Sequence, residues 1–253
     1  MGPLRSDGKH ELATVYQRID LCDRITIEPA AETSVRGFKG DTIVQGALAA
    51  LAPTRHWRIT IKKEIPLAAG LGGGSSDAAT ALRLANAQLD RPLPAAELHE
   101  LAVQVGADVP FFLVDGPQLA QGDGGELEPL ALPQDFIVLL LLPRGATKPS
   151  TAAVYAAFDA RAGAKGFAAR AAALRKSVAA VTRPRDLASL PANDLASSPF
   201  ADRLRALGAF RADVTGAGPV VYGLFTRRSE AQAAARALRG LGRTWITVPA
   251  WYG

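Results

Sequence analysis

A glycine-rich loop followed by two serines is the stretch of this sequence whose residues best suit a definite chemistry. The loop lies within Pro66–Ala79, between a segment that alternates like a strand and an Ala-rich segment with helical spacing. Its glycines and hydroxyl residues are Gly70, Gly72, Gly73, Gly74, Ser75 and Ser76. Glycines let a backbone adopt positive φ and approach a ligand closely. Amides, hydroxyls and the positive end of a helix favour an anion. The loop is therefore predicted to cradle a polyphosphate.

This loop differs from two other phosphate-binding patterns. It is not a Walker A loop, because Ser75 rather than lysine follows the last glycine. It is not a dinucleotide fingerprint, because the third glycine of G-x-G-x-x-G would fall at Ser75. A flexible Gly/Ser linker is the alternative, but such linkers do not usually pass directly into a continuous amphipathic helix. The apolar stripe of that helix is Ala78, Ala81, Leu82, Ala85 and Leu89.

A single carboxylate, that of Asp108, stands in the otherwise apolar stretch Gly106–Phe112. It follows the predicted end of a helix and precedes Pro110. A carboxylate among apolar neighbours either caps a turn or has a function. The residues alone leave both interpretations open.

The elements that must position these residues alternate between strands and helices. Extended structure is expected over 14–28, strands over 57–63 and 136–142, and a glycine loop feeding a strand over 213–225. Helices are expected over 41–51 (with Asp41 as N-cap), 75–89, 95–105 and 230–241, and the spacing over 150–180 is helical. This alternation, with a compositional break near 120–145, predicts an α+β chain of two abutting domains. We place the domains at residues 1–130 and 131–253.

The composition is that of a globular protein, with 48% hydrophobic and 21% charged residues. The longest apolar run, 136–142, is far shorter than the roughly 20 residues of a membrane helix. The N-terminus shows no signal or transit peptide pattern. A lone cysteine, Cys22, allows no internal disulfide, and three scattered histidines argue against a structural zinc site. These features predict a cytoplasmic protein with no membrane partner and no metal site of its own.

A mild positive charge, +5 from 29 Lys and Arg against 24 Asp and Glu, raises the question of a nucleic-acid partner. Near the C-terminus the arginines alternate with alanines, which indicates a solvated helix face. No aromatic residues interleave with these charges, so a stacking platform for nucleic acid is disfavoured. A site for polyphosphate substrates also fits the charge.

Three motifs resemble the signatures of the GHMP kinases. Residues 66–76 match P-x-x-x-G-L-G-[GS]-[GS]-S-S, residues 106–111 match G-A-D-V-P-F, and residues 215–218 match T-G-[AS]-G. Weaker strings, D-G-x-H at 7–10, S-T-x-x-V-[YF] at 150–155 and N-D-L at 193–195, are similar to the branch that acts on 4-diphosphocytidyl-2-C-methyl-D-erythritol. The matches run from about residue 6 to 225, and mevalonate, homoserine and galactose kinases lack the D-G-x-H string.

The resemblance implies a fold, an activity and a set of cofactors. It implies a ribosomal-S5-like N-terminal domain, a ferredoxin-like C-terminal domain and an active site in the cleft between them. The implied reaction is ATP-dependent phosphorylation of the 2-hydroxyl of 4-diphosphocytidyl-2-C-methyl-D-erythritol, a small-molecule substrate of the non-mevalonate isoprenoid pathway. Mg²⁺ would accompany ATP, with no dedicated protein cage visible.

The resemblance also assigns roles to individual residues. Asp108 would be the catalytic base that takes the proton of the attacking hydroxyl. The loop that wraps the ATP phosphates would consist of Pro66, Leu67, Ala68, Ala69, Gly70, Leu71, Gly72, Gly73, Gly74, Ser75 and Ser76. Lys63 would contact the nucleotide, although a solvent-facing strand lysine is an equal alternative. His10 and Tyr155 would shape a cytosine pocket, with Thr215 and Gly216 near the substrate.

Two departures from the family pattern keep other functions open. The family begins with a P-A-K-[LIV]-N strand, whereas only Met1–Ser6 precedes Asp7. Lys9 also stands where the family has an aromatic residue that stacks on cytosine. A late start codon or a shortened chain would explain the first departure. An inactive nucleotide-binding relative and a kinase for another small alcohol are the alternative functions, and the sequence leaves the oligomeric state unknown.

Overall fold

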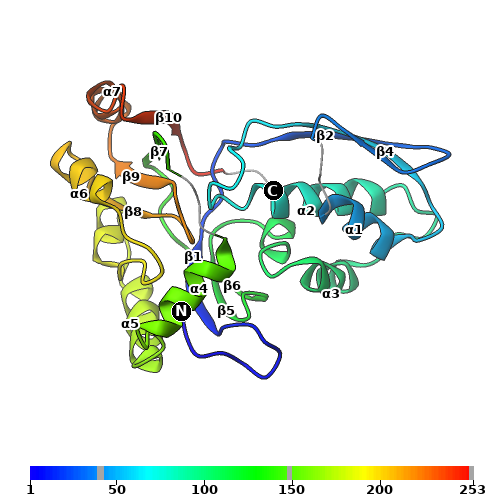
Figure 1. The fold of residues 1–253 in the computed structure, drawn as a ribbon, viewed down its shortest axis with the longest axis horizontal. Coiled ribbons are helices and arrows are strands. Elements are labelled where there is room, and N and C mark those ends of the chain that lie inside the picture. Colours follow the sequence, from blue (N-terminus) through cyan, green and yellow to red (C-terminus); the bar gives the residue numbers. More distant parts are fainter. Residues whose placement is uncertain (39–42, 147–149, 251–253) are drawn as a thin grey trace. The chain divides into compact units, whose positions relative to one another are not determined.

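The computed structural model describes residues 1–38, 43–146 and 150–250. These residues form two compact units, each taken here by itself (Figure 1). One unit comprises the described residues of Leu21–Leu67 and Gly72–Asp115. The other comprises Met1–Asp20, the short segment Ala68–Leu71 and the described residues from Gly116 onward. The predicted division after residue 130 stays a prediction.

The unit around residues 21–115 packs helices against a three-stranded sheet. The sheet has the order β2-β4-β3, with β2 (Arg24–Pro29), β3 (Ser34–Arg36) and β4 (Trp57–Lys62). The helices are α1 (Ile43–Leu51), α2 (Gly73–Asn86), α3 (Ala95–Val105) and the short 3-10 helix η1 (Pro110–Leu113). Alternate residues of β4, including Trp57 and Ile59, are buried against Ala81 and Ala85 of α2. This strand and this helix flank the glycine loop in the sequence.

The second unit contains a four-stranded antiparallel sheet of order β10-β7-β9-β8. Its strands are β7 (Ile137–Pro143), β8 (Arg211–Val214), β9 (Val221–Phe225) and β10 (Gly242–Thr247). Its helices are α4 (Thr151–Ala160), α5 (Phe167–Ala179), η2 (Pro184–Ser189), α6 (Pro199–Ala206) and α7 (Arg228–Ala237). Leu139 and Leu141 of β7 lie in the core with Leu204 and Phe225. The strand order, with helices after the first and third strands, is that of a ferredoxin-like domain.

A separate three-stranded sheet in the same unit carries the N-terminal part of the chain. Its order is β1-β5-β6, from β1 (Leu12–Tyr16), β5 (Gln118–Gly122) and β6 (Glu126–Pro129). Strand β1 pairs antiparallel with β5, so residues more than 100 positions apart in the sequence lie opposite each other, such as Thr14 and Ala120. His10 lies just before β1, in a short hairpin closed by an antiparallel bridge between Leu4 and His10.

Most of the predicted elements are present, with shifted ends. Helix α2 begins at Gly73 rather than Ser75, and the helical stretch 150–180 is split into α4 and α5 around Gly163 and Gly166. The extended stretch 14–28 is interrupted between β1 and β2. Helix α1 is present, but its predicted cap Asp41 lies outside the described residues. The α+β fold class is confirmed, and β3, β5, β6, β8, α6 and β10 were not anticipated.

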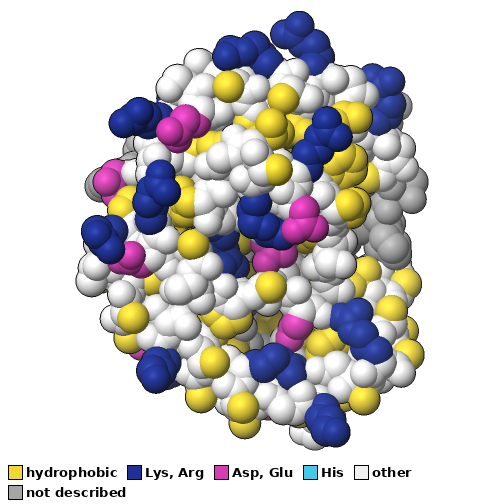
Figure 2. Space-filling model, turned by 90° about the vertical axis from the view of Figure 1, so that its left-hand side faces the viewer, with side chains coloured by type: hydrophobic (Ala, Val, Ile, Leu, Met, Phe, Trp, Pro, Cys, Tyr) yellow, Lys and Arg dark blue, Asp and Glu magenta, His cyan; other side chains and the backbone are white. Residues whose placement is uncertain are grey.

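Two surface properties of the described residues bear on the class of protein. None of their helices combines the length and the apolar character needed to cross a membrane. On the face shown in Figure 2, Lys and Arg side chains are spread among apolar and neutral ones.

Candidate active site

The glycine loop leads directly into α2, and its backbone adopts conformations that favour glycine. Gly70 has a φ of +75° and Gly72, the N-cap of α2, a φ of +66°. A Cβ at Gly70 would lie 2.7 Å from the carbonyl oxygens of Gly218 and Thr215, closer than real Cβ atoms come to backbone. The first turn of a helix leaves amides without partners inside the helix. The loop therefore brings bare backbone and a helix start together, as an anion site requires.

The predicted loop residues differ in their exposure to solvent. Leu67 and Ala68 are exposed, Ala69 is buried, and Pro66 and the residues from Gly70 to Ser76 are half-buried. Ser76 donates its amide to the Gly72 carbonyl at 2.8 Å, which closes the first turn of α2. The hydroxyl-bearing start of α2 is thus reachable by a ligand.

The third signature loop, between β8 and β9, is bonded to the tip of the glycine loop. Thr215 Oγ1 donates to the Gly70 carbonyl at 2.9 Å, and the Val220 amide donates to the Ala69 carbonyl at 3.3 Å. Gly216 is exposed, with a φ of +52°. The predicted substrate residues Thr215 and Gly216 therefore lie beside residues 69–70 of the predicted phosphate loop.

Asn193, from the N-D-L string, supports this third loop, a role that the sequence did not suggest. Its Nδ2 donates to the carbonyl oxygens of Val214 at 3.0 Å and Gly216 at 2.7 Å. Its own amide donates to Asp213 Oδ2 at 2.8 Å, and its Oδ1 accepts from the Leu195 amide at 2.8 Å. The loop is thus held from both sides, by Asn193 and by Gly70.

Lys63 lies at the end of β4 between two buried carboxylates. Its Nζ donates to Asp77 Oδ2 at 2.8 Å and to Asp23 Oδ2 in a very short contact. The side chains of Asp23 and Asp77 are 2% and 3% exposed, and that of Lys63 is 14% exposed. A solvent-facing strand lysine, the alternative interpretation, does not describe this position.

The surroundings of Lys63 and Asp77 shift the pKa of both side chains. Burial alone would lower the pKa of the Lys63 ammonium, but the hydrogen bonds and charges of Asp23 and Asp77 outweigh burial and raise it. Burial raises the pKa of the Asp77 carboxyl to about 6, and the nearby Asp23 charge adds to this rise against the pull of Lys63.

Asp108 lies in the turn between α3 and η1, where its side chain is exposed to solvent. The Val109 amide donates to the Gly106 carbonyl at 3.0 Å, and the buried residues Val109, Pro110 and Phe111 anchor the segment that follows Asp108. The turn is therefore rigid, while the carboxylate points away from the core.

The predicted cytosine residues His10 and Tyr155 lie together in the second unit. Their ring centroids are 5.3 Å apart in an edge-to-face arrangement. His10 is buried, and its Nδ1 donates to the Gly2 carbonyl at 2.9 Å while its Nε2 lies 3.3 Å from Asp159 Oδ2. Tyr155, on α4, is half-buried. The buried histidine thus packs against the tyrosine ring and restricts its orientation.

Comparison with known proteins identifies the family of this chain. A model of the GHMP kinases N terminal domain matches residues 42–116, and a model of the GHMP kinases C terminal matches residues 195–244. A curated 4-diphosphocytidyl-2-C-methyl-D-erythritol kinase from Pelobacter propionicus is 38% identical, over 97% of this chain and 91% of its own. One from Geobacter sulfurreducens is 37% identical, over 96% and 90%. The chain belongs to the GHMP kinase family.

Solved structures agree with this assignment to the GHMP kinases. A crystal structure of 4-(cytidine 5'-diphospho)-2C-methyl-D-erythritol kinase matches with a TM-score of 0.74 and 31% identity, over 98% of this chain and 93% of its own. The mevalonate kinase of Methanococcus jannaschii matches with a TM-score of 0.73 at 14% identity, over 93% and 91%, and so shares the fold alone. The resemblance stated from the motifs is confirmed, and with it the two-domain GHMP kinase fold.

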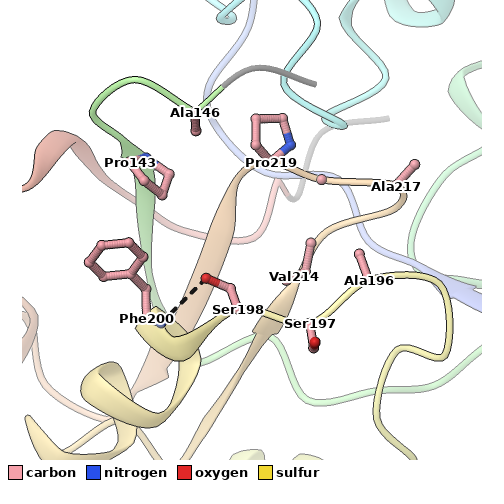
Figure 3. A pocket seen from close by; sticks show the side chains of 10 residues that line it. Pro143, Ala146, Ala196, Ser197, Ser198, Phe200, Val214, Ala217 and Pro219 are labelled. Carbon is pink, nitrogen blue, oxygen red and sulfur yellow. Dashed lines mark hydrogen bonds between the residues drawn. The ribbon is translucent and has the colours of Figure 1, made fainter. Parts of the chain in front are cut away.

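A hollow of about 260 Å³ opens beside the third loop of this GHMP kinase (Figure 3). Val214, Ala217, Gly218 and Pro219 of the loop line one part of it. The remaining lining residues are Pro143, Ala146, Ala196, Ser197, Ser198 and Phe200. Ser198 Oγ accepts from the Phe200 amide at 3.3 Å and caps α6, so it is already engaged. None of the predicted site residues lines this hollow.

Two further observations concern cations at the site. Among the described residues, no group of three or more His, Cys, Asp or Glu side chains is placed to hold a metal ion. Lys9, at the family's aromatic position, pairs with Asp123 Oδ2 at 2.6 Å. Its ammonium is therefore held on the β5–β6 turn, within the same unit as Tyr155.

Proposed function

We propose that this protein transfers the γ-phosphate of ATP to the 2-hydroxyl of 4-diphosphocytidyl-2-C-methyl-D-erythritol, a step of the non-mevalonate isoprenoid pathway. The chain is that of a small-molecule kinase that uses ATP. Relatives named for this substrate match nearly the whole chain at 37–38% identity. The observation that carries the proposal from the structure is the bonding of the third loop to the glycine loop through Thr215 and Gly70.

The ATP phosphates bind along residues 66–76 in this proposal. Positive-φ glycines at Gly70 and Gly72 expose the loop backbone, and the start of α2 adds amides and the hydroxyls of Ser75 and Ser76. This donor set fits a polyanion, because helix starts and bare amides stabilise negative charge. Lys63, at the entrance of the same loop, contributes a cation to the nucleotide site.

Mg²⁺ fits the same donor set when it arrives on the nucleotide. Magnesium in kinase sites takes most of its ligands from phosphates and water, with few from protein. The Ser75 and Ser76 hydroxyls are the oxygen donors that the loop offers it. When bound, the ion neutralises charge on the phosphates.

Asp108 is the proposed catalytic base. Its exposed carboxylate accepts the proton of the substrate 2-hydroxyl as the oxygen attacks the γ-phosphorus of ATP, and ADP leaves. Phosphoryl transfer relies chiefly on positioning and charge stabilisation. The rigid turn around Asp108 suits such a positioning role.

The substrate's cytosine stacks on Tyr155 in this proposal. The ring of Tyr155 lies edge-to-face with the ring of the buried His10, a contact that restricts the tyrosine side chain and so lowers the entropic cost of stacking a base on it. Thr215 and Gly216 lie in the third loop, where they contact the substrate beside the phosphates. Lys9 is tied to Asp123, so we expect it to contribute charge near the pocket rather than a stacking surface.

The substrate is a small molecule, and we propose a cytoplasmic location with no nucleic-acid or membrane partner. A single cysteine that can form no internal disulfide is consistent with a reducing compartment.

Release of ADP that depends on the acceptor tests the proposed function. The full chain is incubated with Mg·ATP and 4-diphosphocytidyl-2-C-methyl-D-erythritol, and ADP is measured by a coupled assay. Mevalonate, homoserine and galactose serve as alternative acceptors in the same assay. The proposal predicts turnover with the cytidyl substrate only. ATP binding by calorimetry without turnover would indicate an inactive nucleotide-binding protein, and turnover with another acceptor would indicate a different kinase.

A further inference from the structure

Two aspartates from separate parts of the sequence converge on Lys63. Asp23 directly precedes β2, and Asp77 follows the two serines of the glycine loop, 54 positions later in the sequence. Neither has a role in the mechanism above. All three residues belong to the unit of residues 21–115, so their arrangement is internal to it. Both carboxylates accept hydrogen bonds from the Lys63 ammonium.

Asp23 also fixes the backbone that enters the glycine loop. Its Oδ1 accepts from the amides of Glu64 at 2.6 Å and Ile65 at 2.9 Å, while its Oδ2 accepts from Lys63. One carboxylate therefore holds both the lysine and the two residues that follow it. The approach to Pro66 has little freedom left as a result.

Asp77 holds the other side of the ammonium from within α2. It is the fifth residue of the helix, which begins at Gly73. Lys63 Nζ lies 3.4 Å from the position that a Cβ on Gly73 would take. The ammonium is thus set against the first turn of α2, where the loop ends and the helix begins, and it lies 5.9 Å from the ring centroid of Phe38.

Burying the charges of Asp23, Lys63 and Asp77 together costs free energy, so this arrangement requires an explanation. Its two carboxylates are almost fully buried, and removing one partner of a buried ion pair leaves an uncompensated charge. A buried pair of carboxylates around one lysine contributes little net stability compared with apolar residues of the same size. Such groups are better explained by a need to hold one side chain in one place.

We propose that Asp23 and Asp77 are positioning residues that aim the Lys63 ammonium at the ATP phosphates and set the start of α2 for them. This inference rests on the proposed function, because it assigns a role within the proposed nucleotide site. It predicts that Asp77 acts on the nucleotide only through Lys63. Its effect should therefore disappear when Lys63 is no longer charged.

A double-mutant cycle on ATP tests this dependence. The variants are Asp77→Asn, Lys63→Met and the combination of the two, and KM is measured for ATP and for the cytidyl substrate. Asp77→Asn keeps the shape and loses the charge that orients the lysine. We expect it to raise KM for ATP about fivefold to tenfold, less than the full effect of one charge-assisted hydrogen bond, because Asp77 acts on the nucleotide only through Lys63. KM for the cytidyl substrate should stay within about twofold of the wild-type value.

The KM of the combined variant for ATP decides between a dependent and an independent role of Asp77. It should have the same KM for ATP as Lys63→Met alone, within about twofold, because Asp77 no longer has a lysine to orient. Lys63→Met leaves two facing carboxylates and is expected to lower the melting temperature, and adding Asp77→Asn should restore part of that loss. The combined variant therefore keeps the test usable if Lys63→Met folds poorly.

Lys62→Met is the matched control. Lys62 is the neighbouring lysine on β4, its side chain is 67% exposed, and its Nζ lies 3.8 Å from Glu64 Oε1. Its KM for ATP should be unchanged. The inference would be overturned if the combined variant raised KM for ATP by the product of the two single effects, or if Asp77→Asn left KM for ATP unchanged. In either case, activity of the wild-type chain would still uphold the proposed function. A wild-type chain that binds no ATP would overturn both.

Discussion

The Thr215 hydroxyl donates to the Gly70 carbonyl across 2.9 Å, which joins two loops that are 145 residues apart in the sequence. The Val220 amide adds a second bond, to the carbonyl of Ala69. The tip of the glycine loop is therefore held by the strand pair β8–β9 rather than by its own residues. If the glycine loop binds the ATP phosphates as proposed, this bonding orients its backbone before a nucleotide arrives and so lowers the reorganisation that accompanies phosphoryl transfer.

Replacing Thr215 with valine removes this bond and preserves the shape of the side chain. We expect the free energy of unfolding to fall by about 0.5–1.5 kcal/mol, the usual net contribution of one hydrogen bond. KM for ATP should rise several-fold because the loop tip is less constrained. Chemical denaturation and steady-state kinetics measure the two effects. Thr60→Val, at an exposed position of β4, is the control, and an equal loss in both variants would contradict the role of the bond.

Gly72→Val should abolish nucleotide binding. Gly72 has a φ of +66° and caps α2, and a Cβ there would lie 3.0 Å from the ring of Phe112. A β-branched residue cannot adopt this backbone conformation without strain, so the amides at the start of α2 would be displaced. Calorimetric titration with ATP measures the loss, and circular dichroism checks that the fold persists.

Gly46→Ala is the matched control for the glycine variant. Gly46 lies inside α1, and a Cβ there would meet no other atom within 4 Å. Alanine should stabilise the helix by up to about 1 kcal/mol and leave ATP binding unchanged. Unaltered ATP affinity in Gly72→Val would show that the loop is not the phosphate site.

Tyr155→Ala should raise KM for the cytidyl substrate about tenfold or more, because stacking of a base on an aromatic ring is worth roughly 1–3 kcal/mol. KM for ATP should change by less than about twofold. Tyr155→Phe retains the ring and should behave almost as the wild-type chain does. A similar rise in both KM values for Tyr155→Ala would instead assign the tyrosine to the packing of α4.

The raised pKa of Asp77, about 6, predicts how stability depends on pH. The folded state holds the Asp77 proton more tightly than the unfolded chain, whose carboxyl has the ordinary value of 3.8. This contribution to stability is complete below pH 4 and is lost as the pH rises through about 6. The pKa of Lys63 is raised, so the contribution of that residue is lost only above its ordinary value of 10.5.

Asp77→Asn should therefore gain stability relative to the wild-type chain as the pH rises from 4 to 7. At pH 4 the Asp77 carboxyl of the wild-type chain and the amide of the variant are both neutral. The urea concentrations at which the two chains are half unfolded should therefore differ least at that pH. Asp90→Asn serves as the control, because Asp90 is 92% exposed and pairs only with Arg55 among the contacts of the described residues. A stability difference that does not vary between pH 4 and 7 would contradict the raised pKa.

The glycine loop and the elements beside it were predicted because local patterns encode them. The alternation over 57–63, the four glycines and the Ala-rich segment require no long-range information, and the anion site that they indicate stays a prediction. The start of α2 was predicted two residues late, because glycine has a low helix propensity although a helix's first turn tolerates it. Strand β10 was missed, because Gly242, Arg243 and Thr244 break its hydrophobic pattern before Trp245.

The Lys63 cluster was missed for a different reason, since its charges come together only in the fold. Asp23 and Lys63 are 40 residues apart and meet through the pairing of β2 with β4. One local signal was available. Asp77 lies one turn before Ala81 on the apolar face of α2, and a carboxylate on a buried helix face requires a partner.

The measurement that tests this account most directly compares the full chain with its Asp108→Asn variant. ADP release is followed with Mg·ATP and 4-diphosphocytidyl-2-C-methyl-D-erythritol, and ATP binding is measured separately by calorimetry. The wild-type chain should turn over at a rate on the order of 1–100 s⁻¹. The variant should lose about 100-fold or more in kcat while its affinity for ATP is unchanged, because the base is lost and the shape is kept. No acceptor-dependent ADP from the wild-type chain, or an undiminished kcat in Asp108→Asn, would contradict the account.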